Sequence, residues 1–394
     1  MSPKTNNPGM HIAIVGCGYW GSKHVRVLNA LEGIGRVLLV DSREDRLADL
    51  ARSYRNALCF TRLADALPLA DAVVVATPPT THVPIALQVI EAGKHVLVEK
   101  PLAPATADAR QVVGAASKAG VVLMVGHTFE YNPAVRKLRE LVSGGELGDL
   151  YYLDSARLNL GLYQDDVNVI WDLAPHDVSI INYVLGRRPV AVQAWAARHA
   201  HRRFEDVAYL RLFYDHFFDG RGLSASIHVS WLDPCKVRRV TAVGSEKMAV
   251  YDDLATDDRI RVLDKGVCLP DSGGSGNLTQ PPMSYRYGDI LVPFVAADEP
   301  LAVQDMHFAE CIMRGSEPLT GGDDGLAVVE VLEAAQLSCR LGRPVLVEEL
   351  GSYAQFIQPT AAANGHRDGG GPAAGRPGGQ SAMAASAARR WEDR

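Results

Sequence analysis

Apolar and polar residues alternate along the first third of the chain in a way that predicts short strands separated by helices. Short apolar runs are typical of strands buried in a parallel sheet. Stretches with helical periodicity cover residues 20–32, 44–54, 81–92 and 105–119. The apolar runs are 11–15, 36–40, 57–60, 72–76, 95–98 and 121–125. This order predicts an α/β fold, a doubly wound parallel sheet with helices on both faces.

After about residue 127 the apolar runs become longer and are separated by short polar turns. They are 151–159, 191–198, 207–214, 223–231, 237–243 and 259–263. Helical periodicity returns at 133–143, 175–185, 301–314 and 324–341. This pattern predicts a second, α+β region whose large, mainly antiparallel open sheet carries helices on one face. Residues 271–287 are rich in Gly, Ser and Pro, so we expect a loop there.

A glycine motif follows the first predicted strand and opens the first predicted helix. It reads Gly16-Cys17-Gly18-Tyr19-Trp20-Gly21. In this context the first glycine permits a tight turn, the second lets a pyrophosphate approach the backbone, and the third lets helix pack closely on strand. We expect the phosphates of a dinucleotide to bind the N–H groups at the start of this helix, beside Tyr19 and Trp20.

An acidic residue, Asp41, ends the second predicted strand. A carboxylate there can accept hydrogen bonds from both hydroxyls of the adenosine ribose and would repel a 2′-phosphate, so NAD is favoured over NADP. Arg43 keeps NADP open, because an arginine nearby can accommodate that phosphate.

Polar residues also follow later strands, at the sheet edge where open α/β sheets bind their ligands. Thr77 and Pro78 follow the fourth strand, so we expect them against the ribose and nicotinamide end of the dinucleotide. His82 is either a pocket residue or only a residue of the next helix start. Glu99 and Lys100 follow the fifth strand. Alone, such a lysine is more often a loop residue, but this one shares its crevice with the dinucleotide.

Two further segments bring candidate substrate contacts to the crevice. Asp172 and His176 are four residues apart, so they share one face if their helix begins before Pro175. A histidine, with an ordinary pKa near ~6.5, can exchange a proton with a substrate, and Asp172 could orient it or hold a hydroxyl. His127 and Asn132 follow the sixth strand as candidate substrate contacts, although Asn132 is equally suited to starting a helix.

Composition narrows the class of protein. The net charge of −6 argues against a nucleic-acid-binding surface, and no apolar run approaches the ~20 residues that span a membrane. The six cysteines are scattered without a Cys-x-x-Cys pair, so neither a disulfide framework nor a zinc site is expected, and we expect no metal. The polar N-terminus lacks a signal-peptide core. We expect a cytoplasmic protein with reduced thiols.

These motifs together resemble the Gfo/Idh/MocA oxidoreductase family. The family combines an early glycine motif with a Glu-Lys-Pro run, here Glu99-Lys100-Pro101, and an Asp-x-x-x-His pair, here Asp172 and His176. The resemblance covers residues 11 to about 348 and implies a Rossmann domain followed by an α/β domain with an open sheet. It also implies that Lys100 is the catalytic lysine, Asp172 a substrate-binding or orienting acid, and His176 the proton acceptor. Lys100 remains an alternative base.

The organisation expected from these patterns has four segments. The last is rich in Gly, Ala and Pro and cannot bury a core. The segments are a flexible N-terminus at 1–10, an NAD(P)-binding Rossmann domain at 11–127, a substrate-binding and oligomerisation domain at 128–358, and a disordered tail at 359–394.

Residues 126–129 and 171–177 look most like the nucleotide-sugar branch of the family, which includes UDP-N-acetyl sugar 3-dehydrogenases. We therefore expect NAD-dependent oxidation of a secondary hydroxyl, at position three, of a sugar or nucleotide sugar. The resemblance also implies a homodimer or homotetramer formed through the open sheet. Glu130 departs from the family, which often has an arginine there, and the segment 271–287 has a sequence of its own.

Three alternatives stay open at this point. One is an NADPH-dependent 3-ketosugar reductase of deoxysugar or antibiotic-sugar biosynthesis, which Arg43 would suit. Another is a dehydrogenase of a free cyclitol such as inositol. The third is a non-catalytic nucleotide-binding sensor, which the loss of Lys100 or His176 would favour; both residues are present.

Overall fold

The structure is a computed structural model of the whole chain. The residues that it describes are 9–54, 57–161, 163–200, 202–215, 222–268 and 284–356. Of the flexible N-terminus expected at 1–10, residues 1–8 lie outside the described residues, whereas Met10 already belongs to a strand. The tail expected from 359 onward also lies outside the described residues. No helix of the described chain is long and apolar enough to cross a membrane.

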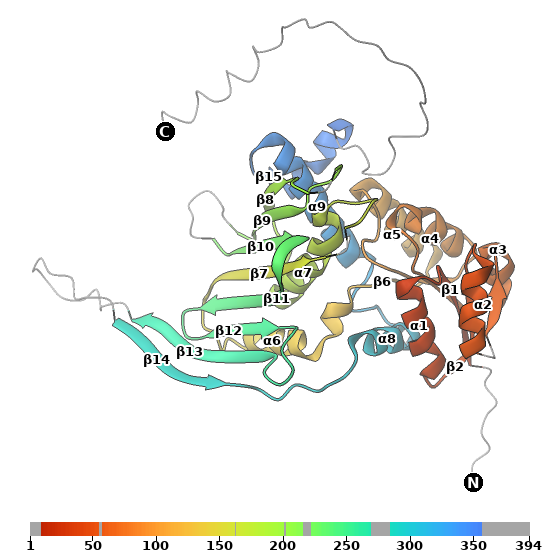
Figure 1. Ribbon diagram of the computed structural model, residues 1–394, viewed down its shortest axis with the longest axis horizontal. Coiled ribbons are helices and arrows are strands. Elements are labelled where there is room, and N and C mark those ends of the chain that lie inside the picture. The colour runs from red at the N-terminus through yellow and green to blue at the C-terminus, as the bar shows by residue number, and fades with distance from the viewer. Residues whose placement is uncertain are drawn as a thin grey trace, which may run out of the picture. The chain divides into compact units, whose positions relative to one another are not determined.

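The first part of the chain forms a six-stranded parallel sheet in the order β3-β2-β1-β4-β5-β6 (Figure 1). Its strands are β1 (Met10–Val15), β2 (Ile34–Val40), β3 (Leu58–Phe60), β4 (Ala72–Val75), β5 (His95–Val98) and β6 (Leu123–Val125). Its helices are α1 (Tyr19–Ala30), α2 (Glu44–Ser53), α3 (Leu63–Ala66), α4 (His82–Glu91) and α5 (Thr106–Ala119). The predicted doubly wound α/β fold is confirmed, although the pattern missed the short helix α3.

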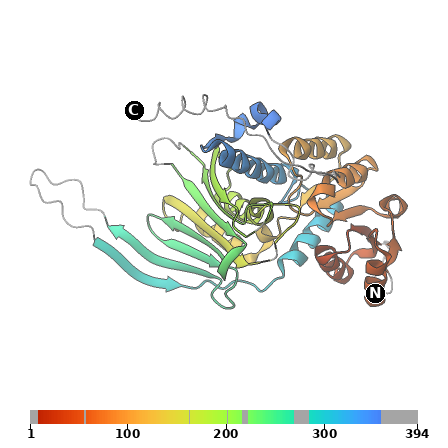
Figure 2. The same ribbon diagram turned by 45° about the horizontal axis from the view of Figure 1, so that its top comes forward.

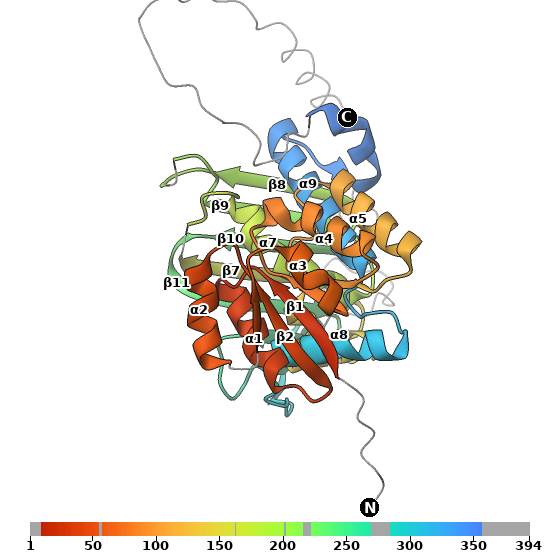
Figure 3. The same cartoon turned by 90° about the vertical axis from the view of Figure 1, so that its right-hand side faces the viewer.

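Both faces of this sheet are buried, which explains the uninterrupted apolar runs. Along β1, Ile12 and Ile14 pack into one core, and Ala13 and Val15 into another. Phe308 of α8 (Pro300–Arg314), from the far end of the chain, is buried in the same core as Ile12. Helix α8 therefore packs beside α1 and contributes to the core of the six-stranded sheet (Figure 3).

The second sheet has nine strands in the order β14-β13-β12-β11-β7-β10-β9-β8-β15 (Figure 1). All neighbouring pairs are antiparallel except β7 and β10, which are parallel. The strands are β7 (Leu150–Leu160), β8 (Ala191–Ala197), β9 (Val207–Phe213), β10 (Ser224–Ser230), β11 (Leu232–Gly244), β12 (Met248–Asp252), β13 (Ile260–Cys268), β14 (Ser284–Leu291) and β15 (Val345–Leu346). The predicted large, mainly antiparallel sheet is confirmed.

Helices cover one face of the nine-stranded sheet (Figure 2). They are α6 (Pro133–Ser143), α7 (Val169–Leu185) and α9 (Gly322–Leu341). Along β9 the residues Ala208, Leu210 and Leu212 are buried on this face, while Tyr209 and Arg211 point to the opposite face and are exposed. This alternation is the pattern that a half-covered antiparallel sheet requires.

Several predicted boundaries are wrong. Strand β11 begins at Leu232 and not at 237, and β13 ends at Cys268 and not at 263. Two further errors have a clear physical reason. The helix expected from Pro175 begins at Val169, because the side chain of Asn168 accepts a hydrogen bond from the Trp171 N–H at 3.1 Å and caps it there. The second error concerns the loop expected at 271–287, since 284–287 belong to strand β14. That strand has no buried face, so its sequence carries no apolar alternation. Residues 271–283 lie outside the described residues.

The cap at Asn168 gives a stability prediction. Replacing Asn168 by alanine removes the oxygen that holds the Trp171 N–H, so unfolding should become easier by about 1 kcal/mol, as for other helix caps. A serine side chain can still cap the helix, so Asn168→Ser should lower the free energy of unfolding by less than Asn168→Ala does. The urea-unfolding midpoints of both variants provide the measurement. Equal losses in the two variants would show that the cap does not stabilise the start of α7.

Candidate active site

The glycine motif forms the tight turn between β1 and α1. Gly16 has φ +89°, and a Cβ on it would lie 2.7 Å from the Ala76 carbonyl oxygen. A Cβ on Gly21 would lie 1.8 Å from the Gly16 carbonyl oxygen, so neither position accepts a side chain. Around Gly18, by contrast, there is nothing within 4 Å of the added Cβ. The turn therefore keeps open space at the glycine where a pyrophosphate is expected.

The start of α1 suits a phosphate. Gly18 is the N-cap, no side chain caps the helix, and its first turn has no acidic residue. The first N–H groups of a helix attract anions, because they have no partner inside the helix. Tyr19 and Trp20 are partly exposed beside this turn, and the Lys23 ammonium lies 4.2 Å and 4.6 Å from the two ring centroids.

Asp41 is buried against the glycine turn. One carboxylate oxygen accepts the Cys17 N–H at 2.8 Å, and the other accepts the Arg43 N–H at 2.9 Å. The Arg43 side chain is about half exposed, with its Nε 3.6 Å from the carboxylate. A ribose hydroxyl can still reach Asp41, because each carboxylate oxygen has two lone pairs. The residues present at this turn therefore fit a dinucleotide.

The segment after β4 supplies residues that line a cavity and a buried histidine that joins two loops. Thr77 and Pro79 line the cavity that contains Lys100, whereas the Pro78 carbonyl accepts a hydrogen bond from the Thr81 hydroxyl at 2.8 Å. The ring of His82 is buried between the carbonyls of Pro101, at 2.8 Å, and Thr77, at 2.9 Å. Burial lowers the pKa of His82, against the effect of these two contacts. The structure places His82 beneath the two loops rather than on a cavity wall.

Lys100 and Asp172 come together from the two halves of the chain. The Lys100 ammonium donates to the Asp172 carbonyl oxygen at 3.0 Å and lies 3.9 Å from its carboxylate. The other carboxylate oxygen accepts a hydrogen bond from the Trp231 indole at 2.9 Å. Both side chains line one cavity of about 180 Å³, here called the Lys100 cavity, together with Trp20, Thr77 and Glu99.

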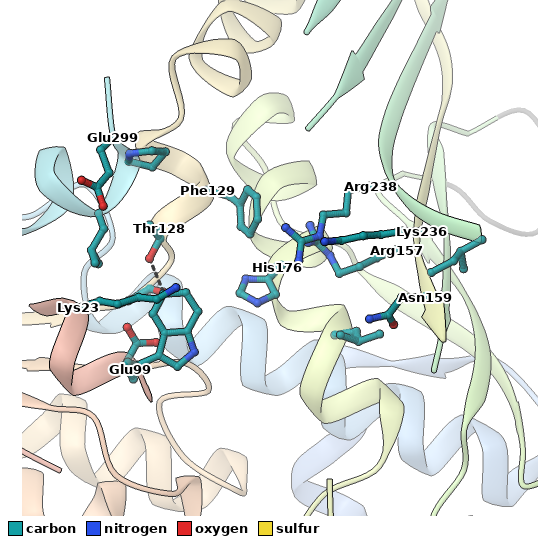
Figure 4. Close-up of a pocket in the computed structure, with 16 residues that line it drawn as sticks. Lys23, Glu99, Thr128, Phe129, Arg157, Asn159, His176, Lys236, Arg238 and Glu299 are labelled. Carbon is teal, nitrogen blue, oxygen red and sulfur yellow. Dashed lines mark hydrogen bonds between the residues drawn. The ribbon is translucent and has the colours of Figure 1, made fainter. Parts of the chain in front are cut away.

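His176 lines a second cavity, of about 270 Å³, here called the His176 cavity. Figure 4 shows its ring between Lys23 and Glu99 on one side and basic side chains of the nine-stranded sheet on the other. The Phe129 ring meets it edge-on, with centroids 5.1 Å apart. Trp20 and Glu99 line both cavities, so the two spaces adjoin along these residues.

The electrostatics favour an unprotonated His176. Burial lowers its pKa well below the ordinary value, and the charges of Lys100 and Arg157 lower it further. Nδ1 of His176 is buried and has no hydrogen-bond partner among the described residues. A neutral imidazole with a free nitrogen can accept a proton or a hydrogen bond.

His127 and Asn132, predicted as substrate contacts, have different surroundings. Both ring nitrogens of His127 are buried without a partner among the described residues, and burial lowers its pKa to about 4. The Asn132 side chain instead accepts the Ala134 N–H at 2.9 Å, capping α6, and donates to the Tyr251 hydroxyl at 3.1 Å. The structure thus uses Asn132 to start a helix, whereas the His127 ring is 1% exposed and lines neither cavity.

Basic residues of the nine-stranded sheet were missed by sequence reasoning, although they line the His176 cavity. They are Arg157 of β7 and Lys236 and Arg238 of β11. Arg157 donates to Asp177 at 2.7 Å, so Asp177 is held in an ion pair while Asp172 faces the Lys100 cavity. No motif marks these cations, because the strand pairing that gathers them is not local in sequence.

Glu130, the departure from the family pattern, lies apart from both cavities. It lines a separate space of about 320 Å³ with Arg139, Arg188 and Asp324. Its carboxyl accepts a hydrogen bond from the Ser179 hydroxyl at 2.8 Å. Burial raises the pKa of Glu130 to about 8.

Two family models match the chain. An oxidoreductase family with an NAD-binding Rossmann fold matches residues 10–127. The GFO/IDH/MocA C-terminal domain matches residues 135–250. Together they cover the six-stranded sheet and the first part of the nine-stranded one.

Two curated relatives match about half of the chain. An inositol 2-dehydrogenase of Saccharopolyspora erythraea is 33% identical over 214 residues, covering 52% of this chain and 62% of its own. A UDP-N-acetylglucosamine 3-dehydrogenase of Acidithiobacillus ferrooxidans is 31% identical over 186 residues, covering 47% of this chain and 57% of its own. The chain thus matches about three-fifths of each relative, and the two relatives differ in substrate.

A solved structure matches over a longer span. GenD2 from gentamicin A biosynthesis, in complex with NAD, has a TM-score of 0.70 and 29% identity. The match covers 88% of this chain and 99% of that chain. The fold is therefore shared over most of the sequence.

The buried carboxyl of Glu130 predicts a pH-dependent stability difference. Its pKa of about 8 lies above the ordinary value of 4.5, so between these values the folded state binds more protons than the unfolded state. Stability is therefore lost as pH rises through this window. Glu130→Gln should gain melting temperature over the wild type as pH rises from 5 to 8, measured by thermal unfolding. Glu32→Gln, at an exposed acid, is the control, and an equal trend there would contradict the assignment.

Proposed function

Because the chain belongs to the Gfo/Idh/MocA oxidoreductase family, we propose that it oxidises a secondary hydroxyl of a sugar or nucleotide sugar, at position three, with NAD as hydride acceptor. The observation that carries this proposal is the contact between Lys100 and Asp172, 3.0 Å from ammonium to carbonyl, in a cavity that Trp20 of the glycine motif also lines. A family fold alone would not specify chemistry. The proposed reaction is supported by acid–base groups, Lys100 and Asp172, in a cavity that the glycine motif also lines.

The residues divide the proton chemistry between them. A bound nicotinamide dinucleotide supplies the hydride acceptor, so the chain need only orient the alcohol and take its proton. His176 is the proposed acceptor, since it is neutral and has a free nitrogen. Lys100 would donate a hydrogen bond to the reacting oxygen and stabilise negative charge on it. Asp172, fixed by Trp231, would hold a neighbouring hydroxyl or orient Lys100. Lys100 acting as the base is the mechanistic alternative.

The charge around the His176 cavity supports a nucleotide sugar over a free cyclitol. Lys23, Lys236 and Arg238 all line it, beyond the residues that would handle the hydroxyl. Arg238 already pairs with Asp253 at 3.3 Å. An uncharged ring of cyclitol size would leave Lys23 and Lys236 without a counterion among the described residues, whereas a diphosphate would satisfy them. The 3-ketosugar reductase remains the second candidate, because the same residues can return a proton and Arg43 lies at the ribose end.

We also propose how the chain is divided and assembled. Residues 11–127 bind the dinucleotide, and 128–358 bind the sugar and contact other subunits through the open sheet face. Exposed aromatic residues support that contact: Trp195 and Tyr209 lie 6.0 Å apart there, and Tyr209 stacks on His228 at 4.0 Å. The five cysteines whose side chains are described are free thiols, which supports a cytoplasmic location.

A substrate screen with a lysine variant tests the proposal. UDP- and dTDP-sugars, free sugars and cyclitols are offered with NAD and NADP while nicotinamide absorbance is followed. Lys100→Met should lower kcat by about 100- to 10,000-fold, the usual loss of one positioned acid–base group. Lys118→Met, at an exposed lysine of α5, is the control. Unchanged turnover in Lys100→Met, or hydride exchange with no sugar or cyclitol, would overturn the proposal.

The cofactor preference is tested at Asp41. Asp41→Ser loses the ribose acceptor and the charge that repels a 2′-phosphate. NADH affinity should fall about tenfold, as for one hydrogen bond to a charged group. NADPH affinity should rise. Fluorescence titration gives both dissociation constants, with Asp45→Ser on α2 as the exposed control. A ratio of the two constants unchanged by Asp41→Ser would show that Asp41 does not select NAD.

A further inference from the structure

His24 of α1 lies between two carboxylates in the interior. Its Nε2 is 3.1 Å from Glu99, and its Nδ1 is 3.0 Å from each carboxylate oxygen of Asp305 on α8. His24 is 0% exposed, Asp305 1% and Glu99 6%. The contacts join the dinucleotide helix, the strand end that carries Lys100, and a helix from the far end of the chain.

The partners determine the charge of this ring. Ionised carboxylates only accept hydrogen bonds, and a neutral imidazole has a single N–H. With both carboxylates ionised, contacts at both nitrogens call for the imidazolium form. Burial raises the pKa of Asp305 and Glu99 raises it further, against the contact with His24, which lowers it. Burial works against the charge, but Asp305 and Glu99 outweigh it and raise the pKa of His24 to about 10. Burial likewise disfavours a charged Glu99, yet the contact with His24 holds the pKa of Glu99 below its usual value.

Glu99 is fixed on its other sides as well. Its second carboxylate oxygen accepts the Lys100 N–H at 3.3 Å. A Cβ on Gly126 would lie 3.1 Å from the carboxylate, so the group packs directly on that backbone. Glu99 lines both the Lys100 cavity and the His176 cavity. The orientation of its carboxylate therefore determines where a hydrogen-bond acceptor lies at the boundary between them.

Helix α8 has further contacts before Asp305, one buried and one on the surface. Gln304, next to Asp305, is fully buried and accepts a hydrogen bond from the Thr128 hydroxyl at 2.8 Å. At the helix start, Glu299 pairs with Arg26 of α1 on the surface. The position of Asp305 relative to His24 is thus set by the packing of α8 on α1.

We propose that His24 is a positioning residue: as a buried imidazolium anchored by Asp305, it holds Glu99 as the ionised acceptor that binds the nicotinamide half of the dinucleotide. This inference rests on the proposed dinucleotide-dependent function. Glu99 would contact the bound dinucleotide through its carboxylate. His24 acts through Glu99 and does not touch the dinucleotide itself.

A double-mutant cycle on NADH binding tests this role. His24→Gln should weaken NADH affinity about tenfold, measured by fluorescence titration, as expected when an acceptor is misplaced. Glu99→Gln should lose a similar amount. The double variant should bind about as well as Glu99→Gln, because the other partner of His24, Asp305, lines neither cavity. Additive losses would overturn the proposal, since His24 would then act independently of Glu99.

Two controls separate this result from general damage. Arg110→Met breaks the exposed pair with Glu330 at 2.8 Å, which joins α5 to α9, and should leave NADH affinity unchanged. If His24→Gln does not fold, Asp305→Asn replaces it in the cycle. Asp305→Asn should then weaken NADH affinity several-fold in the wild-type background and have no effect in the Glu99→Gln background. An equal loss of affinity in Arg110→Met would attribute the effect to loosened packing and overturn the proposal.

The outcomes for this inference and for the proposed function differ. A wild-type chain that binds neither NADH nor NADPH contradicts the proposed function and, with it, the inference. A wild type that binds NADH, beside a folded His24→Gln that binds equally well, overturns the inference alone. Nitrogen chemical shifts give an independent readout: both ring nitrogens of His24 should remain protonated at pH 8, below its pKa of about 10.

Discussion

The parallel pairing of β1, β4, β5 and β6 is the constraint on which the site depends. Parallel strands end at one edge of their sheet, so the residues that follow them are brought together whatever the side chains are. Gly16, Thr77, Glu99 and His127 each follow one of these strands. The second half of the chain then brings α7, α8 and the basic side chains of β7 and β11 to this edge.

Charge compensation decides which groups at this edge are free. Glu99 is paired with His24, and Asp177 with Arg157, so each of these two buried carboxylates has a cationic partner inside the protein. Lys100 has a weaker arrangement, a carbonyl at 3.0 Å and a carboxylate at 3.9 Å, in a partly exposed setting. The cation best placed to exchange partners thus lines the same cavity as Trp20 of the glycine motif.

The sequence predicted what is local and missed what is not. Strand β5 was predicted with its observed bounds, His95–Val98, because a buried parallel strand needs only a short apolar run. The spacing of Asp172 and His176 placed both on one helix, although Asn168 and not Pro175 starts it. The pairing of His24 with Asp305 spans 281 positions, so no local pattern could indicate it.

Hydrogen-bond satisfaction separates structural polar residues from candidate ligand contacts in a way that the sequence cannot. His82 and Asn132 follow strands as His127 does. Their polar side-chain atoms, however, form hydrogen bonds with other residues of the chain. Buried polar atoms normally have partners, so those without one point to a missing ligand or water. His127 and His176 have such atoms, and the charge of Lys100 acts on both rings. A hydroxyl-bearing ligand in the His176 cavity would supply a partner for His176, whereas the buried ring of His127 lines neither cavity.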